Sequence, residues 1–277
     1  MQTLTLRECQ QQMLRVLLRF DEICKENKFK YFLYGGTLIG AVRHNGYIPW
    51  DDDTDVMMPR SDFDKFIQFA KDNEKVLYPF RLCDRANTKN YYYGIPRFSN
   101  MEFRYVVDNE HEKTFDIGTF IDIYPLDNDC DTKSDAVKLR KLCNQKDREF
   151  GWYINPVSAK GFFRTVVRRV LHIFIKMIKG KGFEKVVDSE IRDIVLNNTT
   201  SESRFVGEVV WTTWFIRWEK SKIEQLETTE HIFEGHMFPI PKSYDYILTQ
   251  IYGNYMQLPP EKERKQTHSY KICKREM

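Results

Sequence analysis

Four aspartates between apolar neighbours constrain this chain more than any other feature. Asp51, Asp52, Asp53 and Asp55 follow a tryptophan and precede the apolar segment 56–58 (VMM). In an extended segment the side chains alternate between two faces, so Asp51, Asp53 and Asp55 are expected to project together. Carboxylates on one face lie roughly 7 Å apart and repel each other by a few kcal/mol at an effective dielectric of about 20. The pattern therefore predicts a cation between them.

Carboxylate oxygens are the ligands that divalent cations such as Mg²⁺ and Mn²⁺ prefer, and pairs of these ions are common at phosphoryl-transfer sites. We therefore expect Asp51, Asp53 and Asp55 to be metal ligands for Mg²⁺ or Mn²⁺. A calcium loop of the EF-hand type is excluded, because Val56 and Asp62 occupy the positions where that loop requires glycine and glutamate. A solvated acidic turn is the alternative, which the apolar flanks disfavour.

A pair of glycines precedes the acidic cluster. The strand-favouring segment 29–34 ends at Gly35 and Gly36, and the segment that follows can begin a helix with Thr37 near its N-terminus. Glycine lets backbone N–H groups approach a phosphate without a Cβ atom in the way, and a helix N-terminus adds partial positive charge. We therefore expect Gly35, Gly36 and Thr37 to bind phosphate groups of a substrate. A plain turn is the alternative for the glycine pair taken alone.

The composition limits the class of protein. With 277 residues, 42% of them hydrophobic, the chain is long enough to bury a core, and its formal net charge of +3 gives no general affinity for nucleic acid. The six cysteines form no CxxC pair, so we expect reduced thiols and no structural zinc site. The N-terminal segment carries charges where an export signal needs an unbroken apolar stretch. We therefore expect a cytoplasmic protein.

The hydrophobic pattern predicts mixed α and β structure up to residue 127 and helices from 131 to about 197. Ser61 and Asp64 have the spacing of a capping box, at the start of a helix that we expect to reach Ala70. Another helix is expected from residue 243 to 252, ended by Gly253. The first expected helix spans 5–27, and the expected strands are 29–34, 53–58, 80–83, 91–98, 103–107 and 120–124.

The segment 151–183 contains no acidic residue, and its apolar residues recur at helical spacing. A helix of this kind can lie on an anionic membrane surface, where each basic residue contributes about 1 kcal/mol, or it can pack its apolar stripe on the domain. We favour peripheral membrane contact through residues 160–181. The basic residues are Lys160, Arg164, Arg168, Arg169, Lys176, Lys179 and Lys181.

Three blocks of the sequence resemble the LicD family, whose relatives include fukutin and fukutin-related protein. The resemblance covers about 25–127 and 233–268, whereas the segment 131–230 carries little of it. The three blocks are GGTLIGAVRHNGYIPWDDDTDVMMPR (35–60), FIDIYPLD (120–127) and PKSYDYILTQIYGNYMQLPP (241–260).

The resemblance implies an α+β fold of the nucleotidyltransferase type, similar to DNA polymerase β, with a mixed sheet and flanking helices. It identifies Asp53 and Asp55 as the catalytic Asp-x-Asp pair and Asp122 as the third catalytic acid, which serves as a metal ligand or as a base. A structural carboxylate is the alternative for Asp122. The implied organisation is a single LicD-like domain over 1–277, with a nucleotidyltransferase-like core (1–130), a helical insertion (131–200) and a C-terminal part that completes the domain (201–277).

The implied activity is transfer of a phosphorylated alcohol, such as phosphocholine or ribitol phosphate, from a CDP-linked donor to a hydroxyl group of a cell-surface glycan. The acceptor is a glycan or a lipid-linked glycan, so we expect no nucleic-acid partner and a location at the inner face of the membrane. Among the substrate-binding residues, Arg43 is the first candidate for a phosphate-binding cation, Arg97 the second and His44 the third. The alternatives are an Asp-x-Asp glycosyltransferase that uses a nucleotide sugar and a catalytically silent glycan-assembly scaffold.

Overall fold

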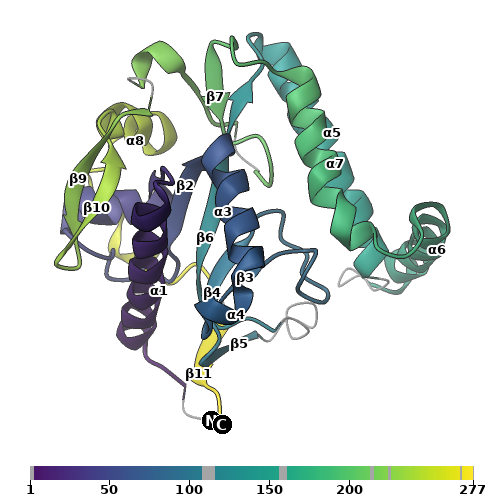
Figure 1. Cartoon of the computed structure of the whole chain (residues 1–277), viewed down its shortest axis with the longest axis horizontal. Helices are drawn as coiled ribbons and strands as arrows, with labels where there is room; N and C mark the ends of the chain where they lie inside the picture. The colour runs from purple at the N-terminus through teal and green to yellow at the C-terminus, as the bar shows by residue number, and fades with distance from the viewer. Residues whose placement is uncertain are drawn as a thin grey trace.

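A seven-stranded mixed sheet forms the centre of the molecule (Figure 1). The computed structural model describes residues 3–107, 116–155, 161–212, 215–223, 226–268 and 270–276. Strands β2 and β6 run parallel, and the other described pairs of this sheet run antiparallel. The sheet order is β1-β2-β6-β4-β3, with β7 on β6 and β8 on β7. The strands are β1 (Phe32–Leu33), β2 (Asp55–Pro59), β3 (Phe80–Cys83), β4 (Arg97–Asn100), β6 (Thr119–Asp129), β7 (Phe205–Gly207) and β8 (Arg217–Glu219).

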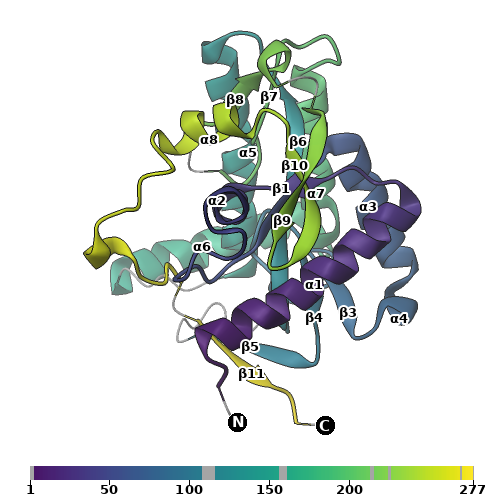
Figure 2. The same ribbon diagram turned by 90° about the vertical axis from the view of Figure 1, so that its left-hand side faces the viewer.

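Two antiparallel ribbons accompany the sheet. Strands β9 (Thr228–Phe233) and β10 (His236–Pro241) form a hairpin, and β5 (Phe103–Val107) pairs with β11 (Tyr270–Lys274). Thr3 forms an isolated bridge with Cys273 of β11, so the two ends of the chain lie close together, as Figure 2 shows. The chain segment that leads into β11 therefore passes close to the N-terminal half of the molecule.

Helices α1 (Leu6–Asn27) and α3 (Arg60–Asp72) cover one face of the sheet. The two helices meet through aromatic rings, with the ring centre of Phe20 in α1 4.8 Å from that of Phe66 in α3. The ring centre of Phe66 lies 5.8 Å from that of Phe98 in β4, so α3 also packs on the sheet. The sequence pattern of α1 is confirmed, and its first turn is held by a capping box between Thr5 and Glu8. The remaining short helices are α4 (Glu74–Leu77), η3 (Lys220–Lys222) and η5 (Glu261–Glu263).

Strand β6 separates an apolar face from a polar one. Ile121 and Ile123 are fully buried in the main core with α1 and α3, as the two-residue period of a strand requires. Asp122 and Tyr124 therefore point to the opposite face. On that face lie α2 (Gly35–Ile39), which continues into the π-helical turn η1 (Gly40–His44), and α8 (Tyr244–Tyr252), as Figure 2 shows.

The described parts of the segment 131–197 are mostly helical, as predicted. They form α5 (Lys133–Ile154), α6 (Phe162–Lys179) and α7 (Phe183–Asn198) beside the sheet (Figure 1), and these helices share a second hydrophobic core. Lys160 lies outside the described residues. Among the helices in the described ranges, none has the length and apolarity needed to cross a bilayer.

Several expectations about single elements are wrong. Ser61 and Asp64 form no capping box, because α3 begins one residue earlier, at Arg60, and Ser61 already lies inside its first turn. Asp64 instead pairs with Arg192 of α7 at 2.9 Å. The strand expected at 91–98 is β4, which begins only at Arg97 because Gly94 and Pro96 interrupt the extended pattern.

The class of the fold is confirmed at the level of a mixed sheet with flanking helices. The nucleotidyltransferase type and the division at residues 130 and 200 stay predictions. Strand β2 begins at Asp55, so residues 53 and 54 of the strand expected at 53–58 precede it. The helix expected from residue 243 is confirmed and ends at Gly253, which has a φ of +66°.

Candidate active site

Two of the three predicted catalytic acids lie side by side on neighbouring strands. Asp55 is the first residue of β2 and aligns with Asp122 of β6 in the parallel register. The backbone N–H of Asp122 donates to the carbonyl oxygen of Thr54 at 2.8 Å, which fixes this alignment. Residues that align on parallel strands point to the same face, so the two carboxylates share the polar face of the sheet.

The acidic loop that leads into β2 shows the predicted alternation. Asp52 and Thr54 are buried, whereas Asp51, Asp53 and Asp55 are only half-buried. The alternation holds although residues 51–54 pair with no strand in the described structure. Asp51, Asp53 and Asp55 therefore interact with one another, as expected, and Asp52 points elsewhere.

The pKa values of these carboxyl groups show the cost of gathering them. Burial raises the pKa of Asp51 to about 8, and the charge of Asp53 adds to the shift. Burial also raises the pKa of Asp53, although the nearby His268 opposes that change. The pKa of Asp55 lies well above its ordinary value because of burial and the charges of Asp53 and Asp122. Ionised carboxylates in this arrangement repel one another and are stabilised by a cation, and Mg²⁺ or Mn²⁺ as that cation stays a prediction.

The two glycines pack directly against the acids. A Cβ atom at Gly35 would lie 2.8 Å from Oδ2 of Asp55, and one at Gly36 would lie 2.8 Å from Oδ2 of Asp51. Gly35 also has a φ of +55°, which side-chain-bearing residues rarely adopt. The hydroxyl oxygen of Thr37 accepts a hydrogen bond from the backbone N–H of Asp55 at 2.8 Å. The structure therefore brings the predicted phosphate-binding turn and the predicted metal ligands into contact.

Arg97 is the buried partner of Asp122. Its Nε donates to Oδ1 of Asp122 at 2.7 Å, and its guanidinium lies 3.7 Å and 3.9 Å from the ring centres of Tyr93 and Phe120. The arginine is 6% exposed, and its Nη1 has no hydrogen-bond partner among the described residues. Asp122 is therefore paired rather than isolated in the strand, and the role of Arg97 as a phosphate-binding cation stays a prediction.

Arg43 and His44 lie at the end of η1, and Arg43 contacts the loop that follows α8. Arg43 donates to the carbonyl oxygen of Tyr255 at 2.5 Å and, through Nε, to Nε2 of His44 at 2.9 Å. The His44 ring meets Trp50 edge-on at 6.4 Å. Binding of substrate phosphates by Arg43 and His44 stays a prediction.

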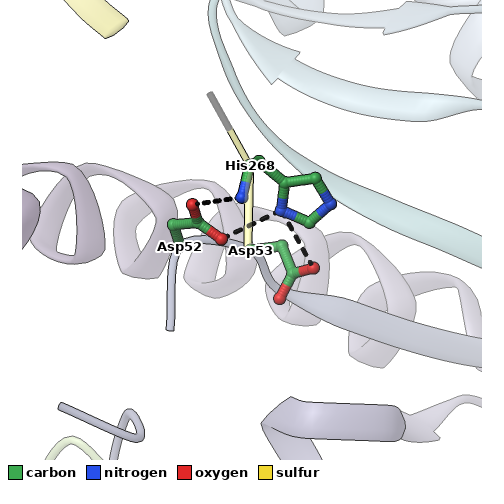
Figure 3. A group of neighbouring side chains, drawn as sticks. All are labelled: Asp52, Asp53 and His268. Carbon is green, nitrogen blue, oxygen red and sulfur yellow. Dashed lines mark hydrogen bonds and ion pairs between the residues drawn. The ribbon is translucent and has the colours of Figure 1, made fainter. Parts of the chain in front are cut away.

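His268 is a member of the acidic site that the sequence analysis missed. Its Nδ1 lies 2.9 Å from Oδ1 of Asp52 and 3.8 Å from Oδ2 of Asp53, and its backbone N–H donates to Asp52 at 3.0 Å (Figure 3). The hydrogen bond to Asp52 raises the pKa of His268. Among the His, Cys, Asp and Glu side chains in the described ranges, Asp52, Asp53 and His268 are the one group of three whose possible metal-ligand atoms all lie within 4.8 Å of one another. The one available signal was that His268 ends the last segment of the family resemblance.

A large cavity opens beside Gly35 and Asp55. Its volume is about 1110 Å³, and it extends from the polar face of the sheet to helices α5 and α6. Glu208, on its wall, accepts the hydroxyl group of Tyr34 at 2.9 Å, and burial raises the pKa of this glutamate. The aromatic residues that line the cavity are Tyr34, Tyr124, Trp152, Trp211 and Tyr252, and the basic ones are Lys141, Arg148 and Arg168.

Comparison with known proteins identifies relatives of this chain. Residues 28–123 match the family model described as the LicD/FKTN/FKRP nucleotidyltransferase domain. The chain is 28% identical to the lipopolysaccharide cholinephosphotransferase LicD of Haemophilus influenzae, over 97% of both chains. Shorter segments match uncharacterised proteins of Rickettsia typhi, at 40% identity over 21% of this chain and 18% of the relative, and of Rickettsia prowazekii, at 49% over 15% of each.

Proposed function

This chain belongs to the LicD family, and on that basis we propose that it transfers phosphocholine, or a similar phosphorylated alcohol, from a CDP-linked donor to a hydroxyl group of a cell-surface glycan. The observation that carries the proposal is the in-register pair Asp55 and Asp122 beside the glycine turn, at one end of an aromatic cavity. The description of the matching family model supports a nucleotidyltransferase type of fold. The Haemophilus influenzae relative supports phosphocholine as the transferred group.

The carboxylates of the site divide the work of the transfer. Asp51, Asp53, Asp55 and Asp122 would hold Mg²⁺ or Mn²⁺, which would neutralise the diphosphate of the donor. The turn at Gly35 and Gly36 offers backbone N–H groups to the phosphate oxygens. In the reaction, the acceptor oxygen forms a bond to the phosphorus atom of phosphocholine, the bond from this phosphorus to the CMP oxygen breaks, and CMP leaves.

In the alternative in which Asp122 serves as the base and not as a metal ligand, it takes the proton of the acceptor hydroxyl group. Arg97 engages Oδ1 of Asp122, so this side chain is held in one orientation while its Oδ2 can accept the proton. The stacking of Arg97 between Tyr93 and Phe120 keeps the guanidinium in place. In this arrangement Arg97 orients Asp122, while its binding of a substrate phosphate stays a prediction.

The cavity fits the quaternary ammonium group of choline. Cations of this kind bind over aromatic faces, and nearby carboxylates add electrostatic attraction. Tyr34, Tyr124 and Tyr252 line the cavity beside Asp55, and Glu208 lies on the same wall. The wall beside Asp55 therefore suits choline better than an uncharged polyol, whereas the basic residues Lys141, Arg148 and Arg168 lie on α5 and α6.

Transfer assays with CDP-choline, CDP-ribitol and sugar nucleotides, each with Mg²⁺, test the proposal. We expect turnover of CDP-choline that chelation of the metal abolishes and that Asp55→Asn lowers by about 10³-fold without a change in fold. Asp193→Asn is the matched control, because this exposed carboxyl group of α7 lies on none of the cavity walls described above. Turnover of a sugar nucleotide would indicate the glycosyltransferase alternative, and no binding of any donor would indicate a silent scaffold.

A further inference from the structure

Helix α6 turns its apolar side toward solvent. At 3.6 residues per turn, ten apolar side chains occupy one continuous half of its circumference. Nine of the ten are exposed, and Phe162, Phe163 and Met177 are 87%, 79% and 72% exposed. The ten residues are Phe162, Phe163, Val166, Val167, Val170, Leu171, Ile173, Phe174, Met177 and Ile178.

The opposite half of α6 fixes the helix to the rest of the molecule. Ile175 is buried in the core of the helical segment, and Nδ1 of His172 lies 3.0 Å from the carbonyl oxygen of Trp152. Lys179 lies 3.4 Å from Glu190 of α7 and 3.8 Å from Glu149 of α5. These contacts orient the helix, so its apolar half faces outward because the polar half is already bound. Leaving so large an apolar surface in water is costly unless it is covered.

Basic residues border the apolar half on both sides. Arg164 follows it on one edge, and Arg169 and Lys176 lie on the other; all three are exposed. The described part of the segment 151–183 contains no acidic residue. Long basic side chains can extend from an apolar surface to lipid phosphates, so this arrangement complements an anionic bilayer surface. A second copy of the same helix would bring like charges together.

We propose that α6 is a membrane-binding helix that lies in the interface of an anionic bilayer, with its apolar half among the acyl chains. This binding does not depend on the activity of the protein. One consequence does rest on the proposed function: Arg168 of α6 lines the same cavity as Asp55, so a bilayer at α6 places the cavity next to lipid-borne acceptors.

Sedimentation of the full chain with lipid vesicles tests the proposal. We expect binding to vesicles of phosphatidylcholine with about one third phosphatidylglycerol, and weaker binding without the anionic lipid. The triple variant Phe163→Ser, Phe174→Ser and Met177→Ser should lower the partition coefficient by about 100-fold, because three large apolar side chains no longer enter the bilayer. Arg164→Gln with Arg169→Gln should lower binding to anionic vesicles by roughly 30-fold and binding to neutral vesicles much less.

A matched control removes exposed apolar side chains elsewhere. Val76 and Met237 are 78% and 51% exposed on α4 and β10, and their replacement by serine should leave vesicle binding unchanged. Circular dichroism of every variant checks that the fold is kept.

Absence of binding by the wild-type chain, or equal binding by the triple variant, would overturn the proposal. A lipid-free dimer that the triple variant converts to a monomer would also overturn it, since the apolar half would then join two copies. CDP-choline turnover measured without lipid shows whether the proposed function holds, so failure of membrane binding can be told apart from failure of that function.

Discussion

Asp122 lies in an apolar strand, yet its immediate neighbours in the sequence do not surround it. Ile121 and Ile123 face the core, whereas Asp122 faces the cavity side of the sheet with Asp55 and is paired with Arg97. The cost of burying this carboxylate is therefore offset by one guanidinium. The carboxylates of Asp51 and Asp55 occupy space that is open only because Gly36 and Gly35 carry no Cβ atom.

Gly36→Ala tests the close approach of the glycine turn to the acids. The backbone of Gly36 tolerates alanine, but the new Cβ atom would lie 2.8 Å from Oδ2 of Asp51 and would displace that carboxylate. We expect Mg²⁺-dependent affinity for CDP-choline, measured by calorimetry, to fall by about tenfold, while the melting temperature changes little.

The control for this variant is Gly180→Ala, at the end of α6. Gly180 has a φ of +69° and nothing within 4 Å of a Cβ atom, so alanine there costs stability through backbone strain alone. Its affinity for the nucleotide should stay unchanged. Unchanged affinity in Gly36→Ala would mean that the turn does not contact the donor.

Local sequence patterns predicted how the three aspartates before and at the start of β2 are oriented. The two-residue period of a strand was enough to place Asp51, Asp53 and Asp55 on one face, because that period is local. The partners of the acids could not be predicted in this way. His268 lies more than 200 positions from Asp52, and nothing in the segment around Arg97, the second candidate for a phosphate-binding cation, shows that it aligns with Asp122.

The turn between β9 and β10 supports the loop that carries the acids. Glu234, in this turn, accepts two hydrogen bonds from Arg7 of α1, at 2.5 and 3.1 Å, and a third from the backbone N–H of Tyr47 at 3.0 Å. A Cβ atom at Gly46 would collide with its carboxylate. A hairpin far along the sequence therefore fixes α1 to the chain segment just before the acidic loop.

Glu234→Gln tests the contribution of this charge. The hydrogen bonds from Arg7 lower the pKa of Glu234, so the ionised form stabilises the fold above the ordinary glutamate pKa of 4.5, and that contribution is lost as the pH falls through the lowered pKa. At pH 7 the variant should be less stable than the wild type by about 1 kcal/mol, and the difference should shrink below pH 4.5. Chemical denaturation at several pH values measures it.

Glu26→Gln, an exposed change on α1, is the control for this experiment and should alter stability little at any pH. A difference between Glu234→Gln and the wild type that stays constant with pH would show that packing, not charge, is lost.

Elements were easier to predict from the sequence than their boundaries. The period of α1 and the helical pattern of 131–197 were sufficient, because long amphipathic segments repeat their signal many times. The capping box predicted at Ser61 was wrong, because the helix begins one residue earlier, at Arg60. The Arg60 side chain forms an ion pair with Asp127 of β6 at 2.6 Å. That ion pair is a tertiary contact that local spacing does not contain.

The helical segment and the sheet meet at a buried arginine. The Arg85 side chain, in the loop after β3, is 0% exposed and lies 2.6 Å from Asp147 of α5 and 3.0 Å from Asp188 of α7. Its guanidinium also stacks at 4.7 Å on Phe150. Because α5 also forms a wall of the candidate cavity, the contact of Arg85 with Asp147 of α5 helps to set the distance between this wall and the sheet.

Arg85→Met would leave the largely buried carboxylate of Asp147 without this partner. Loss of one member of a buried ion pair costs about 3–5 kcal/mol, so we expect faster hydrogen exchange in α5 and α7, with little change in α1 and β6. Arg192→Met is the matched control, because Arg192 joins α7 to Asp64 of α3 through a partly exposed pair whose loss costs about 1 kcal/mol or less. If both variants raised exchange equally throughout the described chain, the helices and the sheet would unfold as one unit and Arg85 would not be the contact that holds them together.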